Sequence, residues 1–546
     1  MTELVSRMSR PLAPLLIALS VFVPAGAHAF CGFYVGGAET SLYNDASMVV
    51  LMREGTRTVL SMQNSYQGPP ERFAMVVPVP VVLQEDDVRT LPRDVFGRVD
   101  RLAAPRLVEY WEQDPCQPPR PERRMRRRSM APRSAARGRA GGGGADLGVT
   151  VEAEFSVGEY DIVILSARDS GGLDTWLRQE GYHIPQGAEA ALRPYVEQGT
   201  KFFVARVDPS RVTFENGRAM LSPLRFHYDS DTFSLPIRLG LINSSGTQDL
   251  IVHVLARNQR YEVANYPNAF IPTNVEVRPN ARARFGAFYA SLFDKTMEVN
   301  PGAVVTEYSW QAGSCDPCPG PTLTGSDIMT LGGDVVGAGQ AAPGPRRGRR
   351  RFFGNPASAF TLTRLHYRYG PGAADADLVF RAAPAVVGGR GTPDPRGRFE
   401  RDVQQSSVNN FQGRYAILHR WRGPIACAQP RRGIWGGPPN GAAPRAEAAL
   451  DLATQPRRGV RLQRFLRRGI PELARPNRRR RGGAGRAPAP LDRSGWKASL
   501  TPMPAREVGA SAAMMGCRVN PRSAAPPVLL LGALGIGLFF VSRRRS

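Results

Sequence analysis

Residues 224–265 read LRFHYDSDTFSLPIRLGLINSSGTQDLIVHVLARNQRYEVAN, and this stretch decides the fold class. It contains four short runs, LRFHY, FSLPIRLGLI, DLIVHVLA and RYEVAN, which are rich in the β-branched and aromatic residues that strands favour. The turn-forming residues at 243–246, Asn-Ser-Ser-Gly, separate two of these runs. Because strands joined by short turns pair antiparallel, the stretch predicts a mainly antiparallel sheet.

Helical patterns precede and follow these strands. Residues 173–179, 189–197 and 283–293 have apolar side chains at helical spacing. Further upstream, residues 95–111 can form an amphipathic helix that Pro105 would kink or end. A mainly antiparallel sheet accompanied by a few helices belongs to the α+β class, which is the fold we predict.

The positive charge of the chain is concentrated in short arginine runs. The 546 residues carry a net charge of +25, and runs such as RRMRRR at 123–128 lie among glycine, proline and alanine, with few large apolar residues to form a core. We predict disordered basic insertions at 117–146 and 333–351 and a low-complexity linker over 428–523. An anionic envelope polymer is one partner that such arginines would suit. The runs lack aromatic residues at stacking spacing, so we expect no specific nucleic-acid partner and favour unconstrained loop sequence as the explanation.

The N-terminus has the three parts of a secretory signal peptide. A basic segment with two arginines precedes a mostly apolar run at 12–23, and Ala27 and Ala29 are small residues at the cleavage-determining positions. We predict cleavage between Ala29 and Phe30. An uncleaved anchor is the alternative, but the apolar run is short for a membrane-spanning helix.

The C-terminus has the pattern of a membrane anchor. The run VLLLGALGIGLFFV at 528–541 should be helical in lipid, because backbone groups there must pair within the segment. Arg543, Arg544 and Arg545 follow it and should stay on the cytoplasmic side, which places the N-terminal body outside.

This tail resembles the MYXO-CTERM type of sorting signal. The matching parts are Gly516-Cys517, a short polar spacer, the apolar helix and the terminal arginines. The resemblance implies processing near Cys517 and transfer to the outer surface, and a plain single-span anchor is the alternative.

These features give the predicted organisation of the chain. The expected segments are a signal peptide at 1–29, ectodomain parts at 30–116, 147–332 and 352–427, insertions at 117–146 and 333–351, a linker at 428–523, a transmembrane or sorting helix at 524–542 and an arginine tail at 543–546.

Export would place the cysteines in an oxidising compartment, where disulfides persist. If Cys517 belongs to the sorting tail, the candidates for structural disulfides are Cys31, Cys116, Cys315, Cys318 and Cys427. Their pairing cannot be deduced from the sequence, because many connectivities are open.

Three kinds of chemistry are open to these cysteines, and none has a complete motif. A redox Cys-x-x-Cys normally begins a helix, whereas Pro-Gly-Pro follows Cys318 and is a poor helix start. A metal site at Cys315 and Cys318 would need two more ligands, and His366 and His419 lack the spacing of known zinc sites. A Cys–His hydrolase based on Cys31 has no accompanying nucleophile motif.

The histidines lie mostly in strand-like apolar runs or next to a turn, so we expect structural roles for them. No phosphate-binding loop, zinc-protease motif or calcium loop is present in the sequence. We therefore predict no catalytic residue, no cofactor and no metal ligand.

Several stretches resemble the bacterial family known as domain of unknown function 2330. They are CGFY at 31–34, FAMVVPVP at 73–80, RLAAPRLVEYW at 101–111, EYDIVILSARDSGGLDTWLRQEGYHIP at 159–185, YSWQAGSCDPCPGPTLT at 308–324, TRLHYRY at 363–369 and NNFQGRYAILHRW at 409–421. The resemblance covers roughly 31–427 in the expected order, with the two arginine-rich insertions as additions. It implies an exported envelope protein, transfers no catalytic residue, and places the Cys315–Cys318 pair inside a family motif.

Our first hypothesis is a non-enzymatic, membrane-tethered surface protein whose partners are the membrane and the export and sorting machinery. Its role would be binding or envelope structure. The second is a thiol-based or hydrolytic surface enzyme that uses Cys31 or Cys315 and Cys318. The third is a polyanion binder that acts through its arginines.

Overall fold

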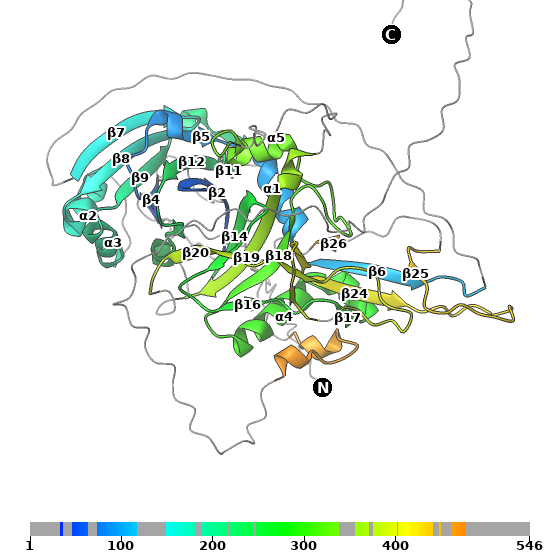
Figure 1. Cartoon of the computed structure of the whole chain (residues 1–546). Coiled ribbons are helices and arrows are strands. Elements are labelled where there is room, and N and C mark those ends of the chain that lie inside the picture. The colour runs from blue at the N-terminus through cyan, green and yellow to red at the C-terminus, as the bar shows by residue number, and fades with distance from the viewer. Residues whose placement is uncertain are drawn as a thin grey trace, which may run out of the picture. The chain divides into compact units, whose positions relative to one another are not determined.

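The computed structural model describes residues 33–35, 46–63, 74–116, 149–180, 187–215, 218–243, 247–337, 355–370, 375–400, 402–439, 447–448 and 460–474. All described residues belong to one compact unit, which lies within Met1–Pro476. This unit is rich in sheet and has few helices, so it belongs to the predicted α+β class (Figure 1).

The largest sheet is built around β14 (Gln248–Arg257) and β19 (Phe360–Tyr369), which pair antiparallel along their whole lengths. β2 (Ala46–Glu54) runs parallel to β14 on one side, and β18 (Val304–Gln311) runs antiparallel to β19 on the other. The other strands of this sheet are β3 (Arg57–Met62), β5 (Val88–Thr90), β12 (Leu224–Asp229), β16 (Asn268–Phe270), β21 (Val386–Gly388), β22 (Gln404–Gln405) and β23 (Asn410–Gln412).

A second sheet packs against one face of the first. It has the order β1 (Phe33–Val35), β4 (Ala74–Val79), β9 (Lys201–Val207), β8 (Tyr160–Ala167) and β7 (Val149–Val157). The two sheets share an apolar core, in which Ile164 and Phe203 of the second sheet meet Val252 of the first. Helices α2 (Ser170–Gln179) and α3 (Ala188–Glu197) cover the outer face of the second sheet (Figure 1).

The other face of the largest sheet carries two helices with separate apolar clusters. Helix α1 (Asp94–Ala103) packs on one cluster together with the short α5 (Gly325–Ile328), and α4 (Phe285–Val299) packs on the other. Leu255 of β14 belongs to the cluster under α1, and Val305 of β18 belongs to the cluster under α4. The sheet surface between these two clusters is therefore bounded by apolar packing on both sides.

A third sheet contains β17 (Val275–Val277), β24 (Arg414–His419), β6 (Arg106–Glu112) and β25 (Trp435–Gly436) in that order, and β26 (Glu447–Ala448) also pairs with β6. β6 and β24 run parallel and lie side by side in Figure 1. Smaller pairings join β10 (Thr213–Glu215) with β11 (Arg218–Met220), and β20 (Leu378–Ala383) with β13 (Ser234–Leu235) and β15 (Arg260–Val263).

Three segments differ from the sequence-based expectation. The helix expected over 95–111 ends at Ala103, and residues 106–112 form strand β6, because Pro105 ends the helix and β24 supplies a pairing partner. The linker expected from 428 is partly folded: Leu462, Phe465 and Leu473 are buried in the cluster under α4. The expected insertion at 333–351 likewise begins with packed residues, since Val336 is buried in the cluster under α1.

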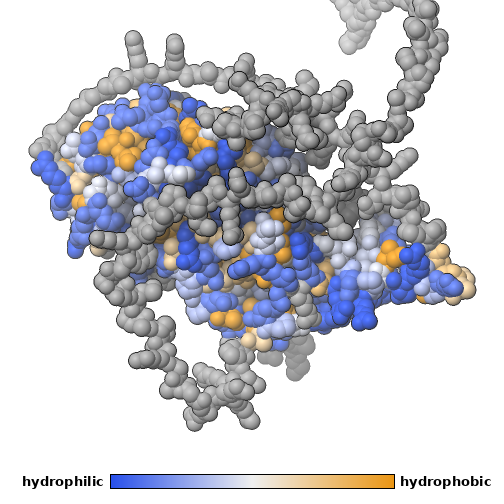
Figure 2. Space-filling view, viewed as in Figure 1, coloured by the Kyte–Doolittle hydropathy of each residue, from blue (hydrophilic) through white to orange (hydrophobic). Residues whose placement is uncertain are grey.

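The described surface is largely hydrophilic with scattered small apolar areas in the view of Figure 2. Among the described residues, no helix has the length and apolar character needed to cross a membrane. The segment expected to do so, 524–542, lies outside the described residues.

Candidate functional site

A dense group of ionisable side chains lies on the sheet surface between α1 and α4. Side chains alternate along a strand, so Arg364, His366 and Arg368 of β19 share one face, while Leu365 and Tyr367 point into the core between the sheets. Asp249 and His253 of β14 and Glu307 of β18 lie on the same face as the three basic residues.

His366 is held between two carboxylates. Its Nδ1 lies 2.8 Å from Oε1 of Glu307, and its Nε2 lies 2.9 Å from Oδ1 of Asp249. The ring of Phe293 from α4 stacks on the imidazole with 3.6 Å between ring centroids. Both ring nitrogens of His366 therefore have a carboxylate partner, and one face of the ring is covered by Phe293.

Two arginines extend this arrangement in both directions. Nε of Arg364 lies 2.6 Å from Oε2 of Glu307, and the same guanidinium also contacts Asp100 of α1. On the other side, Nε of Arg368 lies 2.7 Å from Asp249 and Nη1 lies 2.5 Å from Asp294 of α4. We call the alternating series Asp100, Arg364, Glu307, His366, Asp249, Arg368 and Asp294 the buried ion chain.

The ionisation of the buried ion chain follows from its alternating charges. Burial opposes ionisation of Glu307, but the charges of His366 and Arg364 and hydrogen bonds from His366 and Tyr289 lower the pKa of this carboxyl to about 2. Burial likewise opposes the charge on Asp249, and the contacts with His366 and Arg368 outweigh it, so its pKa is lowered.

Two side chains next to the buried ion chain, those of Tyr289 and His253, are held neutral. Burial, together with the negative charge of Glu307, raises the pKa of Tyr289 well above its ordinary value, so its hydroxyl stays protonated and donates to Glu307. Burial and then the positive charge of Arg364 lower the pKa of His253 well below its ordinary value.

The buried ion chain connects elements that are distant in sequence. It ties α1 and α4 to three adjacent strands, β14, β19 and β18, on the sheet surface between the two apolar clusters. The side chains of Glu307 and His366 are 0% exposed, so a substrate in solution does not reach them. The arrangement is suited to fixing the register of these elements, since removing one member would leave its partner charged and buried.

The four described cysteines form two disulfides. Cys116 follows β6 and is bonded to Cys427 in the loop after β24, across a sequence separation of 311. Cys315 is bonded to Cys318, three residues further on, in the loop after β18. Helix α5 begins only at Gly325, so the pair is not at a helix start, as expected from the Pro-Gly-Pro that follows it.

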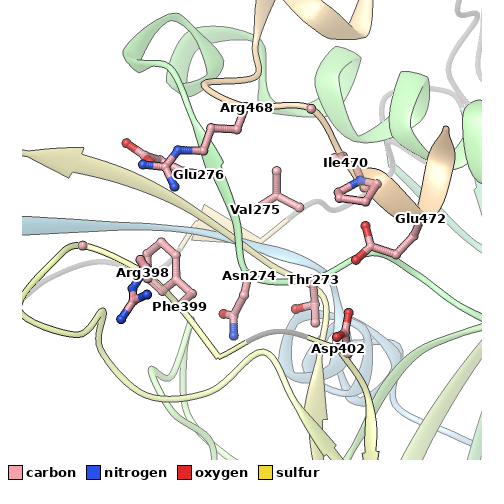
Figure 3. A pocket seen from close by; sticks show the side chains of 13 residues that line it. Thr273, Asn274, Val275, Glu276, Arg398, Phe399, Asp402, Arg468, Ile470 and Glu472 are labelled. Carbon is pink, nitrogen blue, oxygen red and sulfur yellow. The ribbon is translucent and has the colours of Figure 1, made fainter.

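A small pocket lies where β17, the loop at 397–402 and the segment around η9 (Pro471–Leu473) meet (Figure 3). Its volume is about 100 Å³, below the roughly 300–1,000 Å³ of typical ligand sites. Asp402 and Glu472 lie at one end in Figure 3, and Arg398 lies on the opposite side. The Asn274 side chain between them is already bonded to Arg414 and to the carbonyl of Glu400.

The other predicted residues are distributed as follows. Ala29, Phe30, Cys31, His183, Gly516, Cys517, Arg543, Arg544 and Arg545 lie outside the described residues. His227 contacts Asp87, and Nε2 of His419 lies 2.6 Å from Oε2 of Glu109. His366 and His419, weighed as metal ligands with the Cys315–Cys318 pair, are on separate strands, and each contacts carboxylates instead.

Sequence reasoning did not find the buried ion chain. One signal was present in FTLTRLHYRY, where Arg364, His366 and Arg368 recur at every second residue within an otherwise apolar strand. Such a pattern places charges on one face of a buried strand and so requires acidic partners. The identity of those partners was not readable, because Asp100 is 264 residues from Arg364 along the chain.

The sequence matches one family profile over most of its folded part. The profile is described as an uncharacterised protein conserved in bacteria, domain of unknown function 2330 (DUF2330), and matches residues 24–381. No curated protein and no solved structure matches the chain. The matched region includes every member of the buried ion chain and the Cys315–Cys318 pair. It ends before β24 and Cys427, whereas the sequence resemblance had suggested an extent to about 427.

Proposed function

We propose, from the premise that this chain belongs to the bacterial family with domain of unknown function 2330, that it is an exported protein of the cell envelope. Its folded body would stand outside the cytoplasm and be tethered by the apolar segment at 524–542. There it would serve a binding or envelope-structural role without catalysis.

The bond between Cys116 and Cys427 is the observation that carries this proposal. It joins the end of β6 to the loop after β24, and both cysteines are half-buried within the folded unit. Disulfides that close such long loops persist in oxidising compartments and are rare in the cytosol. The bond therefore agrees with the signal peptide that the first 29 residues predict.

The use of the ionisable residues supports a structural or binding role. Each acid of the buried ion chain contacts an arginine or histidine of another element, and each base contacts an acid. Groups used in this way join secondary-structure elements and are not held ready to exchange protons with a substrate.

Export and tethering can be tested together in a bacterial host that has a secretory pathway. The full chain should be recovered in the membrane fraction, accessible to protease added outside the inner membrane, with a mature N-terminus at Phe30. Ala29→Arg should block cleavage, because the signal peptidase requires a small residue there. His28→Arg is the matched control at the adjacent, tolerant position and should leave cleavage intact. Recovery of uncleaved protein in the cytosol with its thiols reduced would contradict the proposal.

A further inference from the structure

The Cys315–Cys318 pair differs from the other disulfide in how it meets solvent. Cys318 is exposed, whereas Cys315 is half-buried and packs against the apolar cluster under α1. Both Cys116 and Cys427 are half-buried. An attacking thiolate in solution can therefore reach the sulfur of Cys318 more readily than any other disulfide sulfur among the described residues.

The loop that carries the pair is held by contacts other than the disulfide. Nη1 of the buried Arg106 donates to the carbonyl of Pro317 at 2.9 Å, and Gln412 donates to the carbonyl of Asp316. Nε1 of Trp310 donates to Oγ of Ser314 at 3.2 Å. The bridge also closes a much shorter loop than the other disulfide, so it restricts the unfolded chain far less. Stabilisation of the fold is accordingly a weak reason for this bond.

One buried arginine, Arg106, places positive charge against the loop, and its pairing partner on β24, Arg414, is also buried. Arg106 donates to the carbonyls of Leu102 and Pro317, and Arg414 donates to Asn274, to the hydroxyl of Tyr110 and to a backbone carbonyl. Within the described part of the chain, neither arginine forms an ion pair with a carboxylate.

The pKa values of the two arginines indicate that the loop lies within their field. Burial lowers the pKa of both guanidinium groups, and the carboxylate of Asp316, between the two cysteines, acts in the opposite direction on both. Positive charge near a cysteine favours its thiolate, which is both the attacking and the leaving form in disulfide exchange.

We propose that the Cys315–Cys318 disulfide is a thiol–disulfide exchange site that takes two electrons from a protein dithiol. A thiolate of the dithiol attacks the sulfur of Cys318, the bond between Cys315 and Cys318 breaks, and Cys315 leaves as a thiolate in the loop that Arg106 contacts. The second thiolate of the substrate then attacks the substrate's other sulfur, which is bonded to Cys318 in the mixed disulfide, and Cys318 is released as a thiolate. The substrate becomes a disulfide, and the two protons lost by its thiols pass to Cys315 and Cys318.

The exchange chemistry goes beyond the proposed envelope role and does not depend on it. Purified full chain should show it wherever the protein resides in the cell, whereas the export experiment reports only location and processing. Either idea can therefore fail while the other stands.

The first test is selective reduction of the native full chain by dithiothreitol, a small dithiol, followed by acid quenching, thiol labelling and peptide mass analysis. We expect Cys315 and Cys318 to become labelled together while Cys116–Cys427 stays bonded, and the rate should be about tenfold or more above that of the second bond. Reduction of both bonds at the same rate, or reduction of the Cys315–Cys318 bond only in denaturant, would overturn the proposal.

Single-cysteine variants test which sulfur is attacked. Cys315→Ser leaves the exposed Cys318 thiol, which should form a mixed disulfide with oxidised glutathione about tenfold faster than the half-buried thiol left by the matched Cys318→Ser. A thermal melt shows that both variants are folded. Equal rates in two folded variants would remove the assignment of Cys318.

A charge variant tests the role of the local field. Asp316→Asn removes the acid between the cysteines, and it should speed reduction severalfold, because the attacking thiolate is negatively charged. Asp86→Asn is the matched control, since Asp86 is also exposed but lies in a different segment, the 3-10 helix Glu85–Asp87. An unchanged or slower rate in Asp316→Asn would contradict the proposed electrostatic assistance.

Discussion

Replacing Glu307 by glutamine is the perturbation that best tests the buried ion chain. The side chain of Glu307 is 0% exposed and accepts hydrogen bonds from Arg364, His366 and Tyr289. Glu307→Gln keeps nearly the same volume, removes the charge and replaces one accepting oxygen with an amide group that donates. Arg364 and His366 then each retain a single carboxylate neighbour in a buried setting.

The magnitude follows from the pKa of this carboxyl. In the folded protein it is about 2, against an ordinary value of 4.5, and at about 1.4 kcal/mol per pH unit the difference corresponds to about 3 kcal/mol. Because the folded pKa is the lower one, this stabilisation is present above pH 4.5 and is lost as the pH falls towards 2. Loss of one partner from a buried ion pair generally costs about 3–5 kcal/mol, which we expect for Glu307→Gln at neutral pH.

The assay is urea unfolding of the full chain at a series of pH values between 3 and 7, with tryptophan fluorescence as the signal that reports unfolding. Glu307→Gln should lower the unfolding midpoint at pH 7 and flatten the acid side of the stability profile. Glu152→Gln is the matched control, because its side chain is 29% exposed and 3.8 Å from Lys201, so we expect less than about 1 kcal/mol. If Glu307→Gln does not fold, Tyr289→Phe removes one hydrogen bond to the same carboxylate and should cost about 1–2 kcal/mol. Unfolding midpoints within error of the wild type for the folded variant, at every pH, would refute the proposed role of Glu307.

Two further predictions concern covalent and backbone constraints. Cys116→Ser combined with Cys427→Ser should lower the free energy of unfolding by about 4–5 kcal/mol, because the lost bond spans 311 residues. Replacing both Cys315 and Cys318 by serine should lower it by about 2 kcal/mol or less, because that bond closes a short loop. Equal losses in the two double variants would contradict this reasoning. Gly389→Ala should lower the thermal midpoint strongly, because the backbone φ is +67° and the new Cβ would lie 2.0 Å from the carbonyl oxygen of Gln412. Gly391→Ala is the matched control, with φ of +71° and no atom within 4 Å of the new Cβ, and a similar loss in both variants would show that the close approach is unimportant.

The fold class was predictable because its evidence is local. The alternating and continuous apolar runs of β14 and β19 indicate strands whatever their neighbours are, and the helical spacing that gives α2 and α3 is likewise contained within about ten residues. The segment after Ala103 was misassigned because helix and strand patterns are similar in a short apolar run, and only pairing with β24 decides between them.

The interior chemistry was much less predictable because it depends on long-range pairing. Arg364 meets Asp100 and Glu307 only after β19 has paired with β18 and α1 has packed above them. The partner of Cys116 is likewise fixed by the parallel pairing of β6 and β24, which no local sequence pattern predicts. The burial of Leu462 and Phe465 also depends on long-range packing. The arginine-rich sequence around them suggests a linker instead.

The most direct measurement for the envelope role is a disulfide map of the protein isolated from its own cells. Thiols are blocked at lysis, and non-reduced peptides are then identified by mass. We expect a mature N-terminus at Phe30 and a peptide that links Cys116 to Cys427. A chain that begins at Met1 and carries these two cysteines as blocked free thiols would contradict an exported, disulfide-bonded protein.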